Sequence, residues 1–473
     1  MMRMRNKEPI FFLIVLIFTN FIIIENNFVR NAESGTDNNF ITNFSTNTLL
    51  STSDFTYPQH VEPTLAIGLN GELYVGWKEA LGLASSGVDV SFTKSLDGGK
   101  NWTSPVSMPG NISDSGGKSD PWLQVYKNTV FYSYLDFTSP TNSQVTMARS
   151  SDGGATWLTS KASQNIHFAD KEAFTISDNG TIYLTYDDVN FQTGLITVKL
   201  SKSKDGGKSF FDISSISSLC FEDNAGPYPA LSSNESLFVS WLSINDSNNF
   251  YGDIFYDHSN NGGKTFSTNK DLNPETEFAS ASTINGSIAK SSMPVMRFDS
   301  NDRLYIAWSE YNTNWKIIIR YSDDFGKHWS PKILINDKNG VDQWEPDMDI
   351  DENDNVHIVW LEEENNQYRP YYRMLSFTGK NRSDVAKSTI IPVASSFTSS
   401  TFFRPGDYFT IRLDSNDIPH VVWTDGRSGG LDIYYASGIF SKSNPSSPSF
   451  SILSVIVTIP IILIFLKKSR IKH

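Results

Sequence analysis

Acidic residues recur in two settings along this sequence, and together they could form one chemical site. The first set lies just before an apolar run, often next to proline, and reads Glu62-Pro63, Asp120-Pro121, Asp170-Lys171-Glu172, Gly226-Pro227, Met293-Pro294, Glu345-Pro346 and Arg404-Pro405. The second set lies two residues after a recurring strand aromatic and reads Glu79, Asp136, Asp188, Ser243, Glu310, Glu362 and Asp425. Six of these seven second positions are acidic.

Carboxylates gathered in this way predict one of two chemistries. Several carboxylate oxygens could bind a divalent cation, so the six acids of the second set are predicted to form a ligand or cation mouth. A crowded carboxyl could instead serve as a general acid, because burial and neighbouring charge raise its pKa. Asp120 and Glu345 are the candidate catalytic carboxyls. Turn and strand-end chemistry explains the same residues without any site, and that interpretation stays open.

Arginines offer a third chemistry, the recognition of an anionic substrate by paired hydrogen bonds. Arg404 is the one arginine at a position of the first set, and Arg369 and Arg427 lie in the same last part of the chain. If these three gathered on one side of a mouth, they would favour catalysis on an anion. A mouth lined only by Asp and Glu would favour binding of a ligand or a cation.

The sequence contains no motif for several other chemistries. HExxH, CxxC, GxSxG and phosphate-loop patterns do not occur. The single cysteine, Cys220, rules out an internal disulfide, and nothing near it indicates an activated thiolate. The formal net charge of −13 disfavours nucleic acid as a partner. No cofactor is indicated beyond the divalent cation considered above.

The candidate residues must be positioned by a repeated turn, Ser-x-Asp-x-Gly-x-x-Trp/Phe. Short Ser and Asp side chains can bind nearby backbone N–H groups, and Gly supplies a conformation that a Cβ would penalise. The frame is therefore predicted to be structural. Its copies are Ser95, Asp97, Gly99 and Trp102; Ser150, Asp152, Gly154 and Trp157; Ser203, Asp205, Gly207 and Phe210; Ser259, Gly263 and Phe266, with Asn261 in place of Asp; and Ser322, Asp324, Gly326 and Trp329.

This frame resembles the Asp-box, or BNR repeat, of the sialidase superfamily of β-propellers. The resemblance implies that the boxes lie on the face opposite to the functional loops. It also implies a site of three arginines, a Tyr–Glu nucleophile pair and an Asp acid/base. Phe403-Arg404-Pro405 is similar to the family's Phe-Arg-x-Pro motif, but it lies in the last unit instead of before the first box. We find no convincing triad with a Tyr–Glu partner.

A second repeat sets the number of units. Alternating strands end at the aromatics Trp77, Tyr134, Tyr186, Trp241, Trp308, Trp360 and Trp423. Each unit then reads as strand, turn, strand, loop, strand, box and strand, which predicts an all-β, seven-bladed propeller of four-stranded antiparallel blades over residues 40–440. The sialidase enzymes have six blades, so this chain departs from them. The last unit lacks a fourth strand, and Phe40 to Phe55 is expected to supply it.

Both ends of the chain read as targeting segments. Residues 1–32 combine basic residues with an apolar run, which predicts a signal peptide or an N-terminal anchor. Residues 441–449 form a Ser/Pro-rich spacer, 450–466 are uncharged and long enough for a transmembrane helix, and 467–473 form a basic cytoplasmic tail. Eight N-x-Ser/Thr sequons agree with a glycoprotein outside the cytoplasm.

The sequence therefore predicts a membrane-anchored propeller at the cell surface that acts as a binding module. Its ligand would be a glycan, a peptide or protein, or a cation, and the loop residues Trp122, Trp315 and Trp344 could stack on sugars. The alternative that the resemblance implies is a sialidase-like exo-glycoside hydrolase. Fold alone does not decide between them.

Overall fold

The structure, a computed structural model of the protein, describes residues 40–51, 57–81, 87–112, 116–139, 141–164, 167–217, 223–245, 251–272, 279–280, 283–284, 288–289, 293–311, 313–336, 338–379, 382–399 and 405–440. The chain divides into two units, and the unit Thr42–Ile439 contains the sheets. Every helix or strand in the described ranges is a β-strand.

The strands form seven four-stranded antiparallel blades, as the sequence predicted. Blades 1 to 4 consist of β3 (Gln59–Ile67), β4 (Leu73–Ala80), β5 (Val88–Ser95) and β6 (Val106–Ser107); β7 (Gly117–Tyr126), β8 (Thr129–Ser139), β9 (Asn142–Ser150) and β10 (Leu158–Lys161); β11 (Phe168–Ile176), β12 (Ile182–Asn190), β13 (Leu195–Ser203) and β14 (Phe211–Ser215); and β15 (Asp223–Leu231), β16 (Leu237–Asn245), β17 (Tyr251–Ser259) and β18 (Lys270–Asp271).

Blades 5 to 7 consist of β22 (Val295–Phe298), β23 (Leu304–Tyr311), β24 (Trp315–Ser322) and β25 (Ile333–Leu334); β26 (Asp342–Ile350), β27 (Val356–Glu364), β28 (Gln367–Thr378) and β29 (Asp384–Lys387); and β32 (Thr410–Leu413), β33 (Pro419–Asp425), β34 (Asp432–Phe440) and β1 (Ile41–Phe44). Short strands add to these blades: β2 (Thr48–Leu49) on β34, β19 (Ala279–Ser280) on β17, and β30 (Ile391–Pro392) and β31 (Thr398–Ser399) on β28. A separate hairpin pairs β20 (Thr283–Ile284) with β21 (Ile288–Ala289).

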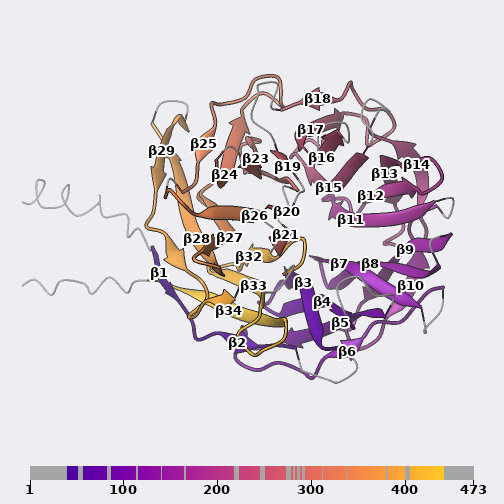
Figure 1. The fold of residues 1–473 in the computed structure, drawn as a ribbon. Coiled ribbons are helices and arrows are strands. Elements are labelled where there is room, and N and C mark those ends of the chain that lie inside the picture. Colours follow the sequence, from indigo (N-terminus) through magenta and orange to yellow (C-terminus); the bar gives the residue numbers. More distant parts are fainter. Residues whose placement is uncertain are drawn as a thin grey trace, which may run out of the picture. The chain divides into compact units, whose positions relative to one another are not determined.

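The first strands of the blades form the inner wall of a closed ring (Figure 1). Each contacts the first strand of the next blade, in the order β3, β7, β11, β15, β22, β26 and β32, and β32 contacts β3 again. Because strands alternate in direction, the chain enters β3 from one face, turns to β4 on the other, and returns. We call the face that carries the starts of the first strands the upper face, and the face that carries the repeated turns the lower face.

The N-terminal segment closes the ring, as expected. Strand β1 pairs with β34 as the fourth strand of blade 7, and β2 pairs with the same strand. The side chain of Phe44 is buried and meets Tyr372 of blade 6 edge-on, with ring centroids 5.4 Å apart. The closing strand therefore removes an unpaired edge and also packs against the neighbouring blade.

The recurring strand aromatics lie in the core between the blades. Trp77, Trp241, Trp308, Trp360 and Trp423 are each at most 1% exposed, and the tyrosines at the two remaining positions are equally buried. A large buried ring at one position of every blade fills the space between tilted sheets and contributes about 2–3 kcal/mol through the apolar area that it removes from water.

The repeated turns close through their own side chains. In the first, Ser95 Oγ donates to Asp97 Oδ1 at 2.8 Å and accepts from the backbone N–H of Gly99 at 2.8 Å. Asp97 Oδ1 also accepts from the backbone N–H of Asn101 at 2.8 Å. Hydrogen bonds from the side chain and backbone of Asn101 and from Ser95 lower the pKa of Asp97 to about 2. Gly99 has φ of +88°, which a residue with a Cβ rarely adopts.

The predicted membrane anchor needs a correction, because the structure supports neither the C-terminal membrane helix nor the membrane as a partner or a membrane-anchored location. In the part of the chain that is described, no helix is long and apolar enough to cross a membrane. A spanning helix needs about 20 apolar residues, whereas the described chain forms short strands. The N-terminal segment 1–32, the spacer 441–449, the span 450–466 and the tail 467–473 lie outside the described residues.

Candidate functional site

Five first strands carry a β-bulge at the same level of the upper face. The pairing register with the second strand shifts between Val61 and Thr64, Ser119 and Trp122, Asp170 and Ala173, Ala225 and Tyr228, and Trp344 and Asp347. In every case the shifted segment is one of the acid-Pro or related dipeptides identified in the sequence. Bulges re-aim side chains, and here each one sits where a first strand begins.

The bulges place strained residues around the axis. Glu62, Asp120, Lys171 and Glu345 have φ between 49° and 58°, and Gly226 has φ of 66°. A left-handed conformation costs a non-glycine residue about 1–2 kcal/mol. Four such residues at one level destabilise the fold, which a purely structural role of this level does not explain. Local strain of this kind clusters at functional sites, which makes this level of the ring the candidate site.

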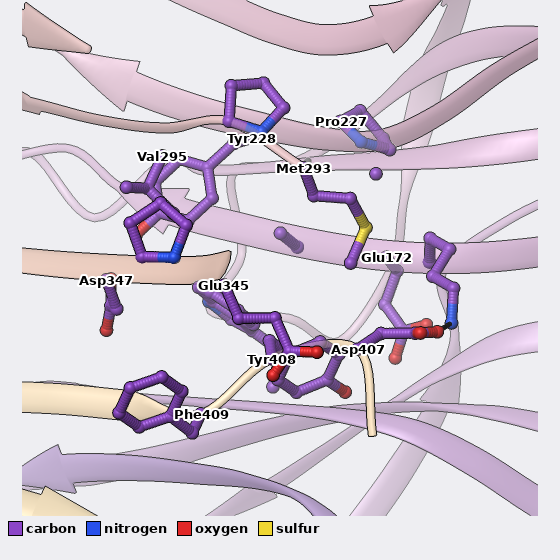
Figure 2. A pocket seen from close by; sticks show the side chains of 16 residues that line it. Glu172, Pro227, Tyr228, Met293, Val295, Glu345, Asp347, Asp407, Tyr408 and Phe409 are labelled. Atoms are coloured by element: carbon purple, nitrogen blue, oxygen red, sulfur yellow. Dashed lines mark hydrogen bonds and ion pairs between the residues drawn. The ribbon is translucent and has the colours of Figure 1, made fainter. Parts of the chain in front are cut away.

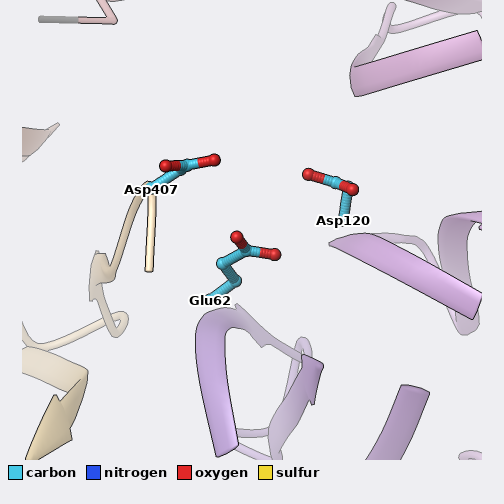
Figure 3. Close-up of side chains that lie close together, drawn as sticks. All are labelled: Glu62, Asp120 and Asp407. Carbon is cyan, nitrogen blue, oxygen red and sulfur yellow. The ribbon is translucent and has the colours of Figure 1, made fainter. Parts of the chain in front are cut away.

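Three carboxylates from three separate blades or loops meet there (Figure 3). One oxygen each from Glu62, Asp120 and Asp407 can be chosen so that all three lie within 4.8 Å of one another. Gly406 permits this approach, since a Cβ at that position would lie 2.9 Å from the backbone nitrogen of Glu62. The loop before β32 can therefore close onto the start of β3 and bring Asp407 to the cluster.

Two lysines neutralise most of this charge. Lys171 Nζ donates to Asp120 Oδ1 at 2.7 Å and also forms an ion pair with Asp407. Lys78 Nζ lies 3.4 Å from Glu62 Oε2. Burial disfavours ionisation of Asp120, but the charges of Lys171 and Lys78 outweigh it and hold its pKa well below the usual range. Asp120 is thus a buried carboxylate that stays ionised.

Glu172 has the opposite electrostatic character. It is 4% exposed, and neither carboxylate oxygen has a hydrogen-bond partner among the described residues. Burial, followed by the negative charge of Asp120, raises its pKa well above the ordinary value. Burial and Asp120 likewise raise the pKa of Asp170 to about 6. Burial and Asp170 raise the pKa of Asp187, whose Oδ2 accepts from the N–H of Gly226 at 3.0 Å.

A pocket opens beside these groups on the upper face (Figure 2). It has a cavity volume of about 50 Å³, and its lining includes Trp122, Lys171, Glu172, Glu345, Asp407 and Tyr408. Glu172, Glu345 and Asp407 are labelled among the residues that line this space in Figure 2. The pocket therefore combines ionisable groups with aromatic and proline walls, which is the usual composition of a small-molecule site.

Aromatic rings form the floor of the pocket. Trp122 meets Tyr228 and Tyr408 edge-on, at centroid distances of 5.4 and 6.0 Å. The Tyr408 hydroxyl donates to the carbonyl of Pro121 at 3.0 Å. Trp122 and Tyr228 also line a second cavity of about 350 Å³ lower along the axis, which includes Arg297 and Arg412. The rings thus separate the acidic mouth from a polar chamber below it.

The structure divides the predicted site residues into two groups. Asp120 and Glu345 lie at the mouth, each buried on a bulge. The six acids of the predicted ligand or cation mouth lie instead on second strands, outside the residues that line the upper pocket. There they bind neighbouring polar groups: Glu79 accepts from Ser91, Asp136 from the N–H groups of Asn111 and Ile112, Asp188 contacts His167, Glu310 pairs with Lys332, Glu362 accepts from Asn336, and Asp425 accepts from Trp423 and Thr398.

Two of the three candidate arginines, Arg369 and Arg427, lie within the described residues, and neither lines the upper pocket. Arg369 lies over the Phe397 ring at 4.0 Å and donates to the Tyr371 hydroxyl, on the third strand of blade 6. Arg427 pairs with Asp425 and donates to Asn47. Arg404 lies outside the described residues. None of the described residues that line the upper pocket is an arginine.

The predicted sugar-stacking tryptophans need a correction. Trp122 is 8% exposed, and Trp315 and Trp344 are fully buried, so none presents an open ring face. Tryptophan provides much of the buried area in cores, and these residues lie within the strands β7, β24 and β26, not on loops. A divalent cation finds its best donor set in Glu62, Asp120 and Asp407, but the Lys171 ammonium already bonds two of these three acids.

Sequence reasoning missed three residues of the mouth, namely Lys171, Asp407 and Tyr408. The sequence places Asp170-Lys171-Glu172 at the start of a strand. A lysine between two acids at that point could have indicated an ion pair within the site. Asp407 and Tyr408 follow Arg404-Pro405 by two and three residues. Their approach depends on the positive φ of Gly406, for which one sequence gives no specific signal.

Comparisons with known proteins give a fold and no family. No protein-family model matches the chain, and no curated protein matches it. Among solved structures, an ulvan lyase of a polysaccharide lyase family is similar, with a TM-score of 0.52 and 12% identity over 84% of this chain and 95% of that one. An α-L-arabinanase of Penicillium chrysogenum has a TM-score of 0.49 and 11% identity over 84% and 98%. The phage phi92 endosialidase has a TM-score of 0.49 and 11% identity over 86% and 71%. The likeness to the ulvan lyase, at 12% identity, is one of fold alone.

Proposed function

We propose that the upper mouth acts on a neutral glycan and cleaves a glycosidic bond by acid/base catalysis. The observation that carries this proposal is the pair Glu172 and Asp120, whose surroundings move their pKa values in opposite directions. A carboxyl with a raised pKa and a second carboxyl that stays ionised are the two groups that glycoside hydrolysis requires. The similar ulvan lyase also acts on a polysaccharide, which agrees with a glycan as the ligand.

The roles follow from the two environments. Glu172 is buried without a hydrogen-bond donor, so it would carry the proton that is transferred to the glycosidic oxygen as the bond to the sugar breaks. Asp120, kept ionised by Lys171, would act on the other side of the sugar, either as the nucleophile or as the base that activates water. Lys171 would position Asp120 and hold its charge.

Charge favours a neutral substrate over an anionic one. Glu62, Asp120 and Asp407 meet at the mouth with Lys171 and Lys78, so the carboxylates outnumber the ammonium groups even before Asp170 and Glu345 are counted. Such a mouth repels a carboxylate substrate. We therefore propose that the substrate is not a sialoside. We also propose that the repeated turns are Asp-boxes of the sialidase-superfamily type.

Turnover by the full-length protein tests the proposal directly. The substrates are a panel of fluorogenic neutral glycosides and neutral polysaccharides, with a sialoside for comparison. We expect release from a neutral substrate, and Glu172→Gln and Asp120→Asn should each lower it by about 10²–10⁴-fold. Asp178→Asn, which changes an exposed acid on the lower face, is the matched control. Absence of release from every neutral substrate by folded protein would refute the hydrolytic role.

A second candidate is a glycan-binding propeller without catalysis, which is the role that the sequence predicted. Two observations favour it. Lys171 already bonds both Asp120 and Asp407, so these carboxylates have a partner within the protein. The cavity, at about 50 Å³, is also small. In that case glycans would bind to the wild type and to Glu172→Gln equally well, and no sugar would be released.

A further inference from the structure

Three phenylalanines form a row on the upper face, outward from the mouth. Phe137 and Phe168 meet edge-on at a centroid distance of 5.7 Å, and Phe168 meets Phe191 at 5.6 Å with an interplanar angle of 50°. Phe137 and Phe168 are half-buried, whereas Phe191 is 64% exposed. We call Phe137, Phe168 and Phe191 the aromatic ladder.

The local structure holds the ladder in place. Phe137 lies near the end of β8 and rests over Gly117, where a Cβ would come within 2.7 Å of the ring. Phe191 sits in the tight turn between β12 and β13, which is closed by a hydrogen bond of 2.8 Å from the N–H of Gly194 to the carbonyl of Asn190. A turn between second and third strands lies on the upper face, so the exposed ring faces the same side as the mouth.

The ladder is continuous with the candidate site through one strand. Phe168 is the first residue of β11, and the mouth residues Asp170, Lys171 and Glu172 follow on the same strand. At about 3.3 Å per residue, Phe168 lies about 7 Å along the strand from Asp170, and Lys171 and Glu172 follow in the bulge. A ligand longer than one sugar that occupies the mouth above blade 3 would therefore reach the ladder.

Polar groups flank the rings. Asp188 lies opposite Ala169 in the pairing of β11 with β12, and its Oδ2 is 3.0 Å from His167 Nδ1 and 3.8 Å from Lys199 Nζ. All three polar side chains are partly exposed. Apolar ring surface beside hydrogen-bonding groups matches a sugar, which presents C–H groups on its faces and hydroxyls at its edge. A single exposed Phe would need no explanation, but a row of three that adjoins a strained acidic mouth does.

We propose that the aromatic ladder is a subsite for a neutral glycan chain, and that the protein takes an oligosaccharide or polysaccharide instead of a single sugar. This inference rests on the proposed function, since the chain would run from the ladder to the mouth. Phe191 is the outermost contact, and Phe168 joins it to the mouth. The subsite adds affinity for long substrates and leaves the chemistry at Glu172 unchanged.

Binding without turnover provides the test. Full-length protein and its Phe191→Ala variant, both also carrying Glu172→Gln, are run in native gels that contain soluble arabinan, xylan, galactomannan or mixed-linkage glucan. We expect at least one polymer to retard the Glu172→Gln protein, and Phe191→Ala to weaken that binding by about 3- to 10-fold, the effect of losing one aromatic contact. Phe191→Tyr should retain it. Leu96→Ala, which removes an exposed apolar side chain from the lower face, is the control.

Two measurements separate the failure of this inference from failure of the proposed function. Retardation by no polymer, or equal retardation of the Phe191→Ala protein, would overturn the ladder as a subsite, whatever the catalytic result. Loss of retardation in Phe191→Ala, with no sugar released by wild type, would support the ladder and refute hydrolysis. Where wild type does turn over, Phe191→Ala should raise KM for the polymer more than KM for a small fluorogenic glycoside; equal kinetics of the two proteins on the polymer would also overturn the inference.

Discussion

Lys171 Nζ donates a hydrogen bond of 2.7 Å to Oδ1 of Asp120, so one ammonium group ties the third blade to the second across the mouth. The same ammonium pairs with Asp407 of the loop before β32. Lys171 occupies the left-handed region with φ of 49°, and its side chain is 18% exposed. A strained residue thus supplies the counter-charge that keeps buried Asp120 ionised, and it also pairs with buried Asp407.

Replacing this lysine with Lys171→Met should destabilise the protein by about 3–5 kcal/mol at pH 7, because it leaves buried charge without a partner. The pKa of Asp120 is lowered in the folded wild type, so its pairing stabilises the fold above the unfolded pKa of about 3.9 and is lost as the pH falls below it. In the variant, burial would raise that pKa. The stability difference should therefore be largest at pH 7 and shrink toward pH 4, as measured by urea unfolding.

Lys199→Met is the control for this prediction. Lys199 lies 3.8 Å from Asp188 and is 23% exposed, so its loss should cost less than about 1 kcal/mol. Equal stability of Lys171→Met and wild type at pH 7 would contradict the role that we assign to Lys171.

The repeats were readable from sequence because their positions follow from local physics. Alternating strands, turn residues and a closing aromatic recur in one frame, so blade number and the closing strand β1 could be predicted. The positions of individual side chains were harder to predict. Asp136 and Glu345 are both candidate acids near strand ends in the sequence, yet Asp136 accepts backbone N–H groups from the preceding connection while Glu345 lines the pocket. The difference is a bulge, which depends on how neighbouring blades pack.

The pH dependence of stability should also report on Glu172. Its folded pKa is raised above the ordinary value, so the folded state holds a proton that the unfolded state has released once the pH exceeds about 4.5. This contribution is complete below the unfolded pKa and declines as pH rises toward the folded value. Glu172→Gln removes the titration. Its stability relative to wild type should therefore increase from pH 5 to pH 8 in urea titrations, and a constant difference over that range would contradict the raised pKa.

The repeated turns should contribute to stability and leave the mouth unaffected. Ser150 Oγ donates to Asp152 at 2.7 Å and accepts from the N–H of Gly154 at 2.7 Å. Ser150→Ala leaves that N–H without its acceptor and should cost about 1–3 kcal/mol in chemical denaturation. Ser376→Ala is the control, since Ser376 lies within β28 of blade 6, where it pairs with Ala386 of β29, and belongs to none of the repeated turns. A similar cost for both variants would show that the turn geometry is not the source.

Closure of the ring gives the last prediction. Phe44 of β1 is 6% exposed and packs edge-on against Tyr372 at 5.4 Å, so the closing strand is held by a contact to blade 6 as well as by its pairing with β34. Phe44→Ala should lower the free energy of unfolding by about 3–5 kcal/mol, the usual cost of a buried phenylalanine. Frequent release of β1 would also expose the edge of β34, a template for pairing with a second chain. We therefore expect faster proteolysis near residue 44 and dimers in light scattering as concentration rises.

Phe40→Ala, at a ring that is 43% exposed, should show neither effect. If Phe44→Ala is no less stable than Phe40→Ala and stays monomeric, β1 is not what closes the propeller.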